Sequence, residues 1–126
     1  MHPEGFAKSI GALVLPEIPK ILTLLDRTAV SPTYGCFDRT YWHYRMIDFP
    51  CGMSQEFVLP LALVWSMQQL PENPYYGSAE IRELIVAGMR FAARSSHPDG
   101  SCDDYYPFER AAGAAAFSLF AILRSA

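Results

Sequence analysis

The chain has 126 residues, of which 51% are hydrophobic and 18% are charged, and its formal net charge is −3. This length suits one domain with a sizeable core, and this composition excludes a disordered chain. The mild acidic charge gives no electrostatic basis for binding nucleic acid or an anionic membrane. We therefore expect a single domain spanning residues 1–126, without nucleic-acid or membrane partners.

The sequence shows no sign of a membrane-spanning helix or a signal peptide, and its cysteines favour a cytoplasmic protein. Prolines and charged residues interrupt every apolar run before it reaches about 18 residues, the length a membrane-spanning helix needs. The N-terminus has Glu4 ahead of its apolar part and no basic lead, so it does not read as a signal peptide. The three cysteines, Cys36, Cys51 and Cys102, are an odd number, which favours reduced, buried thiols and a cytoplasmic protein.

The first half of the chain has helical apolar spacing. Helices are predicted over residues 6–15 and 17–27, separated or kinked by Pro16 and Pro19, since proline removes a backbone donor. A third helix is predicted over residues 54–69, apolar on nearly every side and therefore buried between neighbours. Because Pro60 lies inside it, this helix either bends there or becomes regular only near residue 59.

The clearest helical pattern begins after Ser78, which suits an N-cap, with Glu80 in the first turn. A loop with a turn at residues 98–100 follows, and His97 is expected to be exposed there. The last helix is predicted from Pro107 to about Arg124. No segment has a strand pattern, so the expected fold class is all-α, built of stacked antiparallel helical hairpins.

The loop "YGCFDRTYWHYRMIDFPCGMSQEF" (residues 34–57) is rich in aromatic, basic and thiol side chains. Arginine offers a planar fork for carboxylates, histidine titrates near neutral pH, and tyrosine and tryptophan give flat apolar faces with a polar handle. Such residues are typical of a ligand-binding cleft. The residues alone leave a structural alternative open: the rings fill the core, and Asp38 pairs with Arg39 or Arg45 to hold the loop.

The segment "DGSCDDYYPFER" (residues 99–110) is the second candidate. Its adjacent carboxylates, Asp103 and Asp104, suit general acid–base chemistry or, alternatively, a solvated turn with an N-cap. The attractive functional interpretation places Tyr105, Tyr106 and Glu109 along a cleft. No phosphate-binding glycine pattern, GxSxG or HExxH motif occurs.

A metal site is a further possibility. Cys36, Cys51, His43 and Cys102 could supply four ligands, but no spacing presents a preformed pair. No cofactor is therefore expected, and a zinc-containing helical toroid stays as an alternative.

Two segments together carry a family resemblance. "GCFDRTYWHYRMIDFPCGMSQEF" (residues 35–57, the first motif) resembles the GxFDRRxWxWKFxDFPxxxxQEG-like stretch of helical-toroid proteins related to heparinase II/III and alginate lyases, especially those of polysaccharide-biosynthesis clusters. "DGSCDDYYPFERAAGAAAFSLFAI" (residues 99–122, the second motif) is similar to their DGSFDEYYPNExSxxATAFxLYA segment. The resemblance implies a partial (α/α) toroid whose alternate helices line a cleft.

In such enzymes a tyrosine or histidine removes the proton alpha to a uronic acid carboxylate, and polar side chains neutralise that carboxylate. The resemblance assigns catalysis to His43 and Tyr41. It assigns binding of an acidic polysaccharide or oligosaccharide to Arg39, Trp42, Arg45, Gln55, Glu56, Tyr105, Tyr106 and Glu109.

The predicted helices, about five, are too few to close a toroid, and no segment can form the β-sandwich that usually completes a lyase site. The resemblance thus implies the N-terminal part, or a shortened relative, of a larger toroid domain, without full lyase activity from this chain alone. Apolar faces left open would be buried in a homodimer. The alternative function is a non-catalytic helical scaffold or oligomerisation module.

Overall fold

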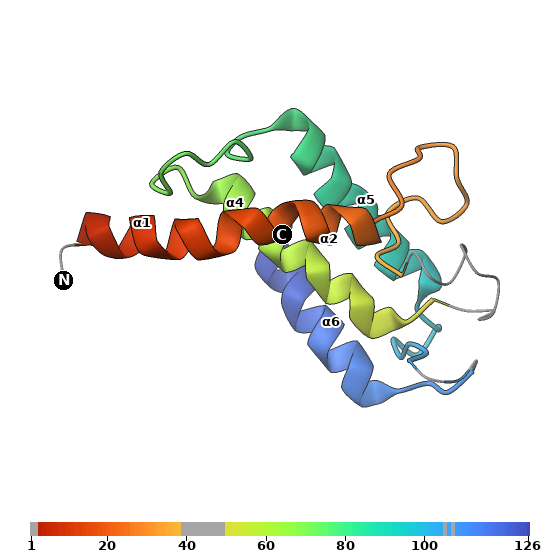
Figure 1. Cartoon of the computed structure of the whole chain (residues 1–126). Helices are drawn as coiled ribbons and strands as arrows, with labels where there is room; N and C mark the ends of the chain where they lie inside the picture. Colours follow the sequence, from red (N-terminus) through yellow and green to blue (C-terminus); the bar gives the residue numbers. More distant parts are fainter. Residues whose placement is uncertain (1–2, 39–49, 105, 107) are drawn as a thin grey trace.

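The computed structural model describes residues 3–38, 50–104, 106 and 108–126. Their helices are α1 (Pro3–Val14), α2 (Ile18–Leu24), α4 (Val58–Ser66), α5 (Ala79–Ser95) and α6 (Ala112–Ser125), with the short 3₁₀ helices η1 (Leu15–Glu17) and η2 (Gly52–Phe57) (Figure 1). Within the described ranges there is no strand, only an isolated bridge between Cys102 and Ala111. The predicted all-α class is confirmed.

The N-terminal helices follow one another along nearly one line (Figure 1). The predicted break at Pro16 and Pro19 is confirmed as a single 3₁₀ turn, after which Pro19 sits in the first turn of α2, where its missing N–H is not needed. α2 ends at Leu24, earlier than predicted, because Leu25 turns extended with ψ 131°.

The helix predicted over residues 54–69 has two parts. η2 leads into α4, so Pro60 falls in the first turn of the regular helix, where proline costs no hydrogen bond. Of the two alternatives for Pro60, the late regular start is therefore the correct one. α4 ends at Ser66, and the side-chain amide of Asn73 donates to the carbonyls of Val64 and Met67 at 2.7 and 3.1 Å.

α5 begins where the sequence predicts. The hydroxyl of Ser78 accepts a hydrogen bond from the N–H of Ile81 at 3.3 Å, which confirms Ser78 as its N-cap. The apolar stripe of α5 then faces α4, with Ile81, Ile85 and Phe91 all buried.

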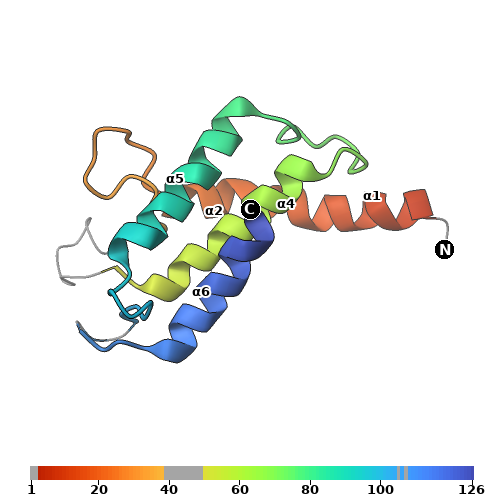
Figure 2. The same ribbon diagram turned by 180° about the vertical axis from the view of Figure 1, so that it is seen from behind.

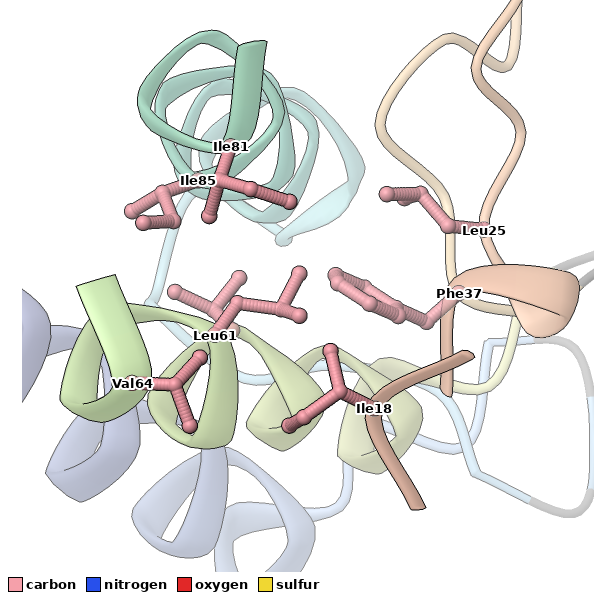
Figure 3. Packing of buried hydrophobic residues seen from close by; sticks show 8 residues of the cluster. Ile18, Leu25, Phe37, Leu61, Val64, Ile81 and Ile85 are labelled. Carbon is pink, nitrogen blue, oxygen red and sulfur yellow. The ribbon is translucent and has the colours of Figure 1, made fainter. Parts of the chain in front are cut away.

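The core lies where α2, α4, α5 and the loop after α2 converge. Figure 3 shows side chains from these segments pointing toward one another around Leu61. The buried cluster comprises Ile18, Leu25, Phe37, Val58, Leu61, Val64, Ile81 and Ile85. α6 packs separately, against η2 and α4.

The start of α6 corrects the prediction. A helix from Pro107 is wrong, since α6 begins at Ala112. The backbones of Phe108 and Arg110 are left-handed, with φ of 60° and 56°, which a right-handed helix cannot contain. Both N–H groups instead donate to the carboxylate of Asp103, at 2.9 and 3.3 Å.

α1 extends beyond the other helices in both views (Figure 1 and Figure 2). It leaves apolar side chains in solvent, including Phe6 and Leu13, which are 53% and 72% exposed. Among the described helices, none has the length and apolar character required to cross a membrane.

Candidate functional site

The predicted site residues fall into two groups. Six of them lie outside the described residues: Arg39, Tyr41, Trp42, His43, Arg45 and Tyr105. The other four, Gln55, Glu56, Tyr106 and Glu109, are described.

The structure joins the two motifs. The N–H of Gly52 donates to the carbonyl of Asp103 at 2.7 Å, and the thiol of Cys51 donates to Oδ1 of Asp104 at 2.9 Å. Within the first motif, the N–H of Cys51 donates to Oδ2 of Asp38 at 2.8 Å. Asp38 and Cys51, which lie on either side of residues 39–49, are thus tied together, and Cys51 lies against the second motif.

A further bond fixes the last helix to the same place. The hydroxyl of Ser118, which is buried on α6, donates to the carbonyl of Gly52 at 2.6 Å. A Cβ on Gly52 would lie 2.4 Å from Sγ of Cys102, so only glycine fits here. We call this contact between the motifs, at Cys51, Gly52, Asp103 and Asp104, the joint. The joint is therefore tightly packed.

Gln55 is an internal cross-link. Its side chain is 1% exposed, its Nε2 donates to the carbonyls of Gly35 and Gly88, and its Oε1 accepts from the N–H of Phe37. Because these bonds use both amide hydrogens, the group holds the first motif to α5. The amide of Gln55 is thus engaged inside the fold and not turned toward a ligand.

The next residue, Glu56, is exposed and lies elsewhere. It borders an apolar groove of about 460 Å³ between α1, α4 and α6, whose walls include Ile10, Leu63 and Phe120. The structure therefore brings Glu56 beside the α6 part of the second motif, which includes Phe120, and not into the segment that holds Tyr106 and Glu109.

Tyr106 and Glu109 both lie in the segment before α6. Tyr106 is 69% exposed, so its side chain is open to a ligand. Glu109 is also exposed, and its Oε2 accepts from the N–H of Asp104 at 3.0 Å. The role of these two residues along a ligand cleft stays a prediction.

His97 corrects a second prediction, because it is not exposed. Its side chain is 17% exposed and its Nε2 lies 2.7 Å from Oδ1 of Asp103, which is 13% exposed. Burial opposes ionisation of Asp103, but the hydrogen bonds from His97 and from the N–H groups of Phe108 and Arg110 outweigh it and lower the pKa of this carboxyl. Asp103 is thus an ionised carboxylate that holds the loop together through its hydrogen bonds.

The signal that could have found this pair is the turn at residues 98–100. The N–H of His97 donates to the carbonyl of Ser101 at 2.8 Å, so the turn reverses the chain and brings residue 97 beside residue 103. The turn itself is predictable from the sequence, whereas the contact between His97 and Asp103 is seen only in the structure.

A cavity of about 700 Å³ lies beside the joint, within the usual size range of ligand sites. Both motifs line it, the first with Gly52 and Gln55 and the second with Cys102, Arg110 and Ser118. Small side chains of α5 and α6 form much of its remaining wall. Arg110 lies 3.5 Å from Asp99 and is 58% exposed, so it supplies a cation at the cavity edge.

The cysteines are free thiols. Cys36 and Cys102 are buried and Cys51 is half-buried, and burial raises the pKa of all three, that of Cys36 to about 12. Within the described part of the chain, no group of three or more His, Cys, Asp or Glu side chains is placed to hold a metal ion. His43, the fourth ligand of the predicted zinc set, lies outside that part.

Comparisons of the chain with protein-family models, with curated proteins and with solved structures find no match. The relationship to heparinase II/III and alginate lyases therefore stays a prediction from the two motifs.

Proposed function

We propose that this chain is a helical domain of a polysaccharide-lyase-like protein that binds, or helps to process, an acidic polysaccharide containing uronic acid. The observation that carries the proposal is the joint between the motifs. Two segments about 50 residues apart, chosen for their chemistry, meet through the Gly52–Asp103 and Cys51–Asp104 bonds, and both line one cavity of about 700 Å³.

Carboxylates are numerous around the joint, among them Asp99, Asp103 and Asp104, and Arg110 supplies a positive group there for an anionic sugar. Arg110 borders the cavity, and the first motif contributes Arg39 and Arg45 from its sequence. The contact of Arg110 with Asp99 is long and exposed at both partners, and exposed ion pairs of this kind are weak. The guanidinium can therefore exchange this partner for a sugar carboxylate.

The packing is compatible with part of an (α/α) toroid. α4 contacts α5, the next helix in the chain, and also α6, the helix after that, as an inner helix of a toroid would contact its hairpin partner and the next inner helix. In the proposed enzyme His43 or Tyr41 removes the proton alpha to the carboxylate, and positive groups stabilise the charge that develops. Turnover would require the further helices of the complete toroid.

The test is an NMR titration of the isotope-labelled chain with uronic acid oligosaccharides and, in parallel, with neutral oligosaccharides of equal length. We expect localised shifts at Cys51, Gly52, Cys102 and Arg110 with the uronates alone. If neither sugar shifts these residues, the proposal is wrong for this chain.

A second candidate function has its own observation. Large apolar side chains on α1 and α6 lie in solvent, among them Leu13, Phe117 and Phe120, and the two phenylalanines line the groove of about 460 Å³. Such a surface favours a scaffold or oligomerisation module, of which a homodimer is the simplest form.

A further inference from the structure

The segment before α6 holds two side chains in a backbone conformation that they normally avoid. Phe108 has φ 60° and Arg110 has φ 56°, in the left-handed region that suits glycine and strains residues with a Cβ. Strain of this kind persists only where surrounding contacts impose it, and it gathers at binding and catalytic sites.

The carboxylate of Asp103 imposes it here. Its Oδ2 accepts from the N–H of Phe108 at 2.9 Å, and its Oδ1 accepts from the N–H of Arg110 at 3.3 Å. Nε2 of His97, 2.7 Å from the same Oδ1, fixes the carboxylate in turn. One half-buried side chain thus holds two alternate residues of an exposed segment.

The two residues held by Asp103 carry an aromatic ring, that of Phe108, and a guanidinium, that of Arg110. Phe108 is 81% exposed, so its ring adds little to the core, and the tilted His97 ring lies at a centroid distance of 6.5 Å. Arg110 is 58% exposed and borders the cavity that both motifs line. Burial in the fold therefore gives no reason for either side chain to be held there.

The chemistry of the two groups matches one ligand class. An aromatic face packs on the apolar C–H face of a pyranose ring, and a guanidinium fork pairs with a carboxylate. A uronic acid unit carries both features on one ring. Neutral sugars lack the carboxylate, and simple carboxylates lack the apolar face.

We propose that Phe108 and Arg110 form a uronate subsite, in which the Phe108 ring stacks on the sugar and Arg110 exchanges Asp99 for the sugar carboxylate. Asp103 is the positioning residue that holds both in place. This inference rests on the proposed function, because it names the residues through which the chain would recognise an acidic sugar. Neither residue was among those that the sequence singled out.

The experiment measures the Kd of a uronic acid trisaccharide and of a neutral trisaccharide by isothermal titration. Arg110→Gln should weaken uronate binding about tenfold, equivalent to roughly 1.4 kcal/mol, and should remove the preference over the neutral sugar. Arg110→Lys keeps the positive charge but loses the planar fork of the guanidinium. Its affinity for the uronate should therefore lie between those of the wild type and Arg110→Gln. Phe108→Ala should weaken the binding of both sugars, since stacking does not depend on the carboxylate.

Matched controls lie on α6. Phe117→Ala removes another exposed ring, which lines the other groove, and Arg124→Gln removes an exposed arginine in the last turn. Both controls should keep the wild-type Kd.

A variant that relieves the strain separates binding from folding. Phe108→Gly suits the left-handed backbone, so its melting temperature should equal or exceed that of the wild type while uronate binding weakens. An unchanged affinity in Phe108→Gly would overturn the subsite.

The remaining outcomes separate the two proposals. If the wild type binds uronate and the Phe108 and Arg110 variants bind it equally well, the subsite is wrong and the proposed function stands. If the wild type binds neither sugar, both are overturned. If the variants change the mass of a protein assembly but not the sugar affinity, the exposed pair is a protein contact and the subsite is again wrong.

Discussion

Gln55 shows how one buried polar side chain can connect three parts of a small fold. It lies in η2 and bonds the backbone of the loop before residue 39 at Gly35 and Phe37 and the backbone of α5 at Gly88. Buried amides of this kind stabilise a fold only while all their partners are satisfied.

Gln55→Leu keeps the volume of the side chain but removes three buried hydrogen bonds, and it leaves the N–H of Phe37 and the carbonyl of Gly35 without the partner that Gln55 supplies. We expect the free energy of unfolding to fall by about 3 kcal/mol, because each unsatisfied group carries its full desolvation cost. Urea unfolding monitored by circular dichroism measures this loss. Gln68→Leu, at an exposed position, is the control and should change stability by about 0.5 kcal/mol or less. Equal stability of the two variants would contradict the cross-link.

Asp26 gives the chain an acid-sensitive residue. Its side chain is buried, which opposes ionisation, but the hydroxyls of Ser31 and Thr33 and the N–H of Thr28 outweigh this effect and lower its pKa below 3.8. Since the folded pKa lies below the unfolded one, Asp26 stabilises the fold fully above the unfolded pKa, and this stabilisation is lost as pH falls through the folded pKa.

Asp26→Asn should therefore flatten the decline of unfolding free energy on the acid side, between about pH 5 and pH 2. Denaturant titrations at successive pH values measure the slope. Ser31→Ala removes one of the two hydroxyl donors, bonded at 2.5 Å, and should give an intermediate slope. A slope in Asp26→Asn as steep as in the wild type would show that other carboxyls control the acid response.

At the scale of the helices, two glycines with opposite surroundings test the packing. A Cβ on Gly88 of α5 would lie 2.6 Å from Cγ2 of Val58 and 3.0 Å from Cε2 of Phe37, whereas a Cβ on Gly113 of α6 would meet nothing within 4 Å. The Gly88 contacts are made with stiff, buried neighbours that cannot move aside.

Gly88→Ala should destabilise the protein by about 1–3 kcal/mol despite the better helix propensity of alanine. Gly113→Ala should be neutral or should stabilise it by up to about 0.5 kcal/mol. Thermal unfolding of the two variants, compared with the wild type, measures the difference. Two variants of the same sign would show that α5 does not approach η2 and α4 as closely as described.

The helices themselves were largely predictable, because their signals are local. The apolar stripe of α5, the cap at Ser78 and the prolines around η1 each act within one or two turns. The start of α6 was not predictable in this way. After Pro107, the sequence up to residue 111 contains no strong helix breaker. A helix is prevented there because the carboxylate of Asp103 accepts hydrogen bonds from the N–H groups of Phe108 and Arg110.

The candidate site was predictable in outline but not in its roles. Residue chemistry singled out two segments, and the structure brings them into contact at Gly52 and Asp103. Residue chemistry alone did not distinguish Gln55 as an internal cross-link. It also assigned no role to His97, which contacts Asp103. Those roles depend on which groups the fold buries, and composition does not contain that information.

At the scale of the whole molecule, the apolar faces of α1 and α6 are the dominant unsatisfied feature. On α6, Phe117 and Phe120 are each 63% exposed, and Leu13 of α1 is 72% exposed. Surfaces of this kind commonly mark interaction sites, and a stable dimer buries about 1,600 Å² in total.

We predict a mass that rises with concentration toward that of a homodimer, measured by sedimentation equilibrium. The double variant Phe117→Ser with Phe120→Ser should remain monomeric with an unchanged circular dichroism spectrum, because it removes exposed side chains only. Val30→Ser, at a 93% exposed loop position, is the control and should associate as the wild type does. A monomeric wild type at every concentration would remove the oligomerisation alternative.

The three free thiols differ in burial, and their rates of chemical labelling can therefore report local opening of the chain. Thiolate is the species that alkylating reagents attack, so Cys36, fully buried and with its pKa raised to about 12, can be labelled only when the chain around it opens. Cys51 is half-buried and should be labelled first. The order and pace of alkylation, followed by mass spectrometry, would thus report how often the two motifs separate and whether a bound sugar holds them closed.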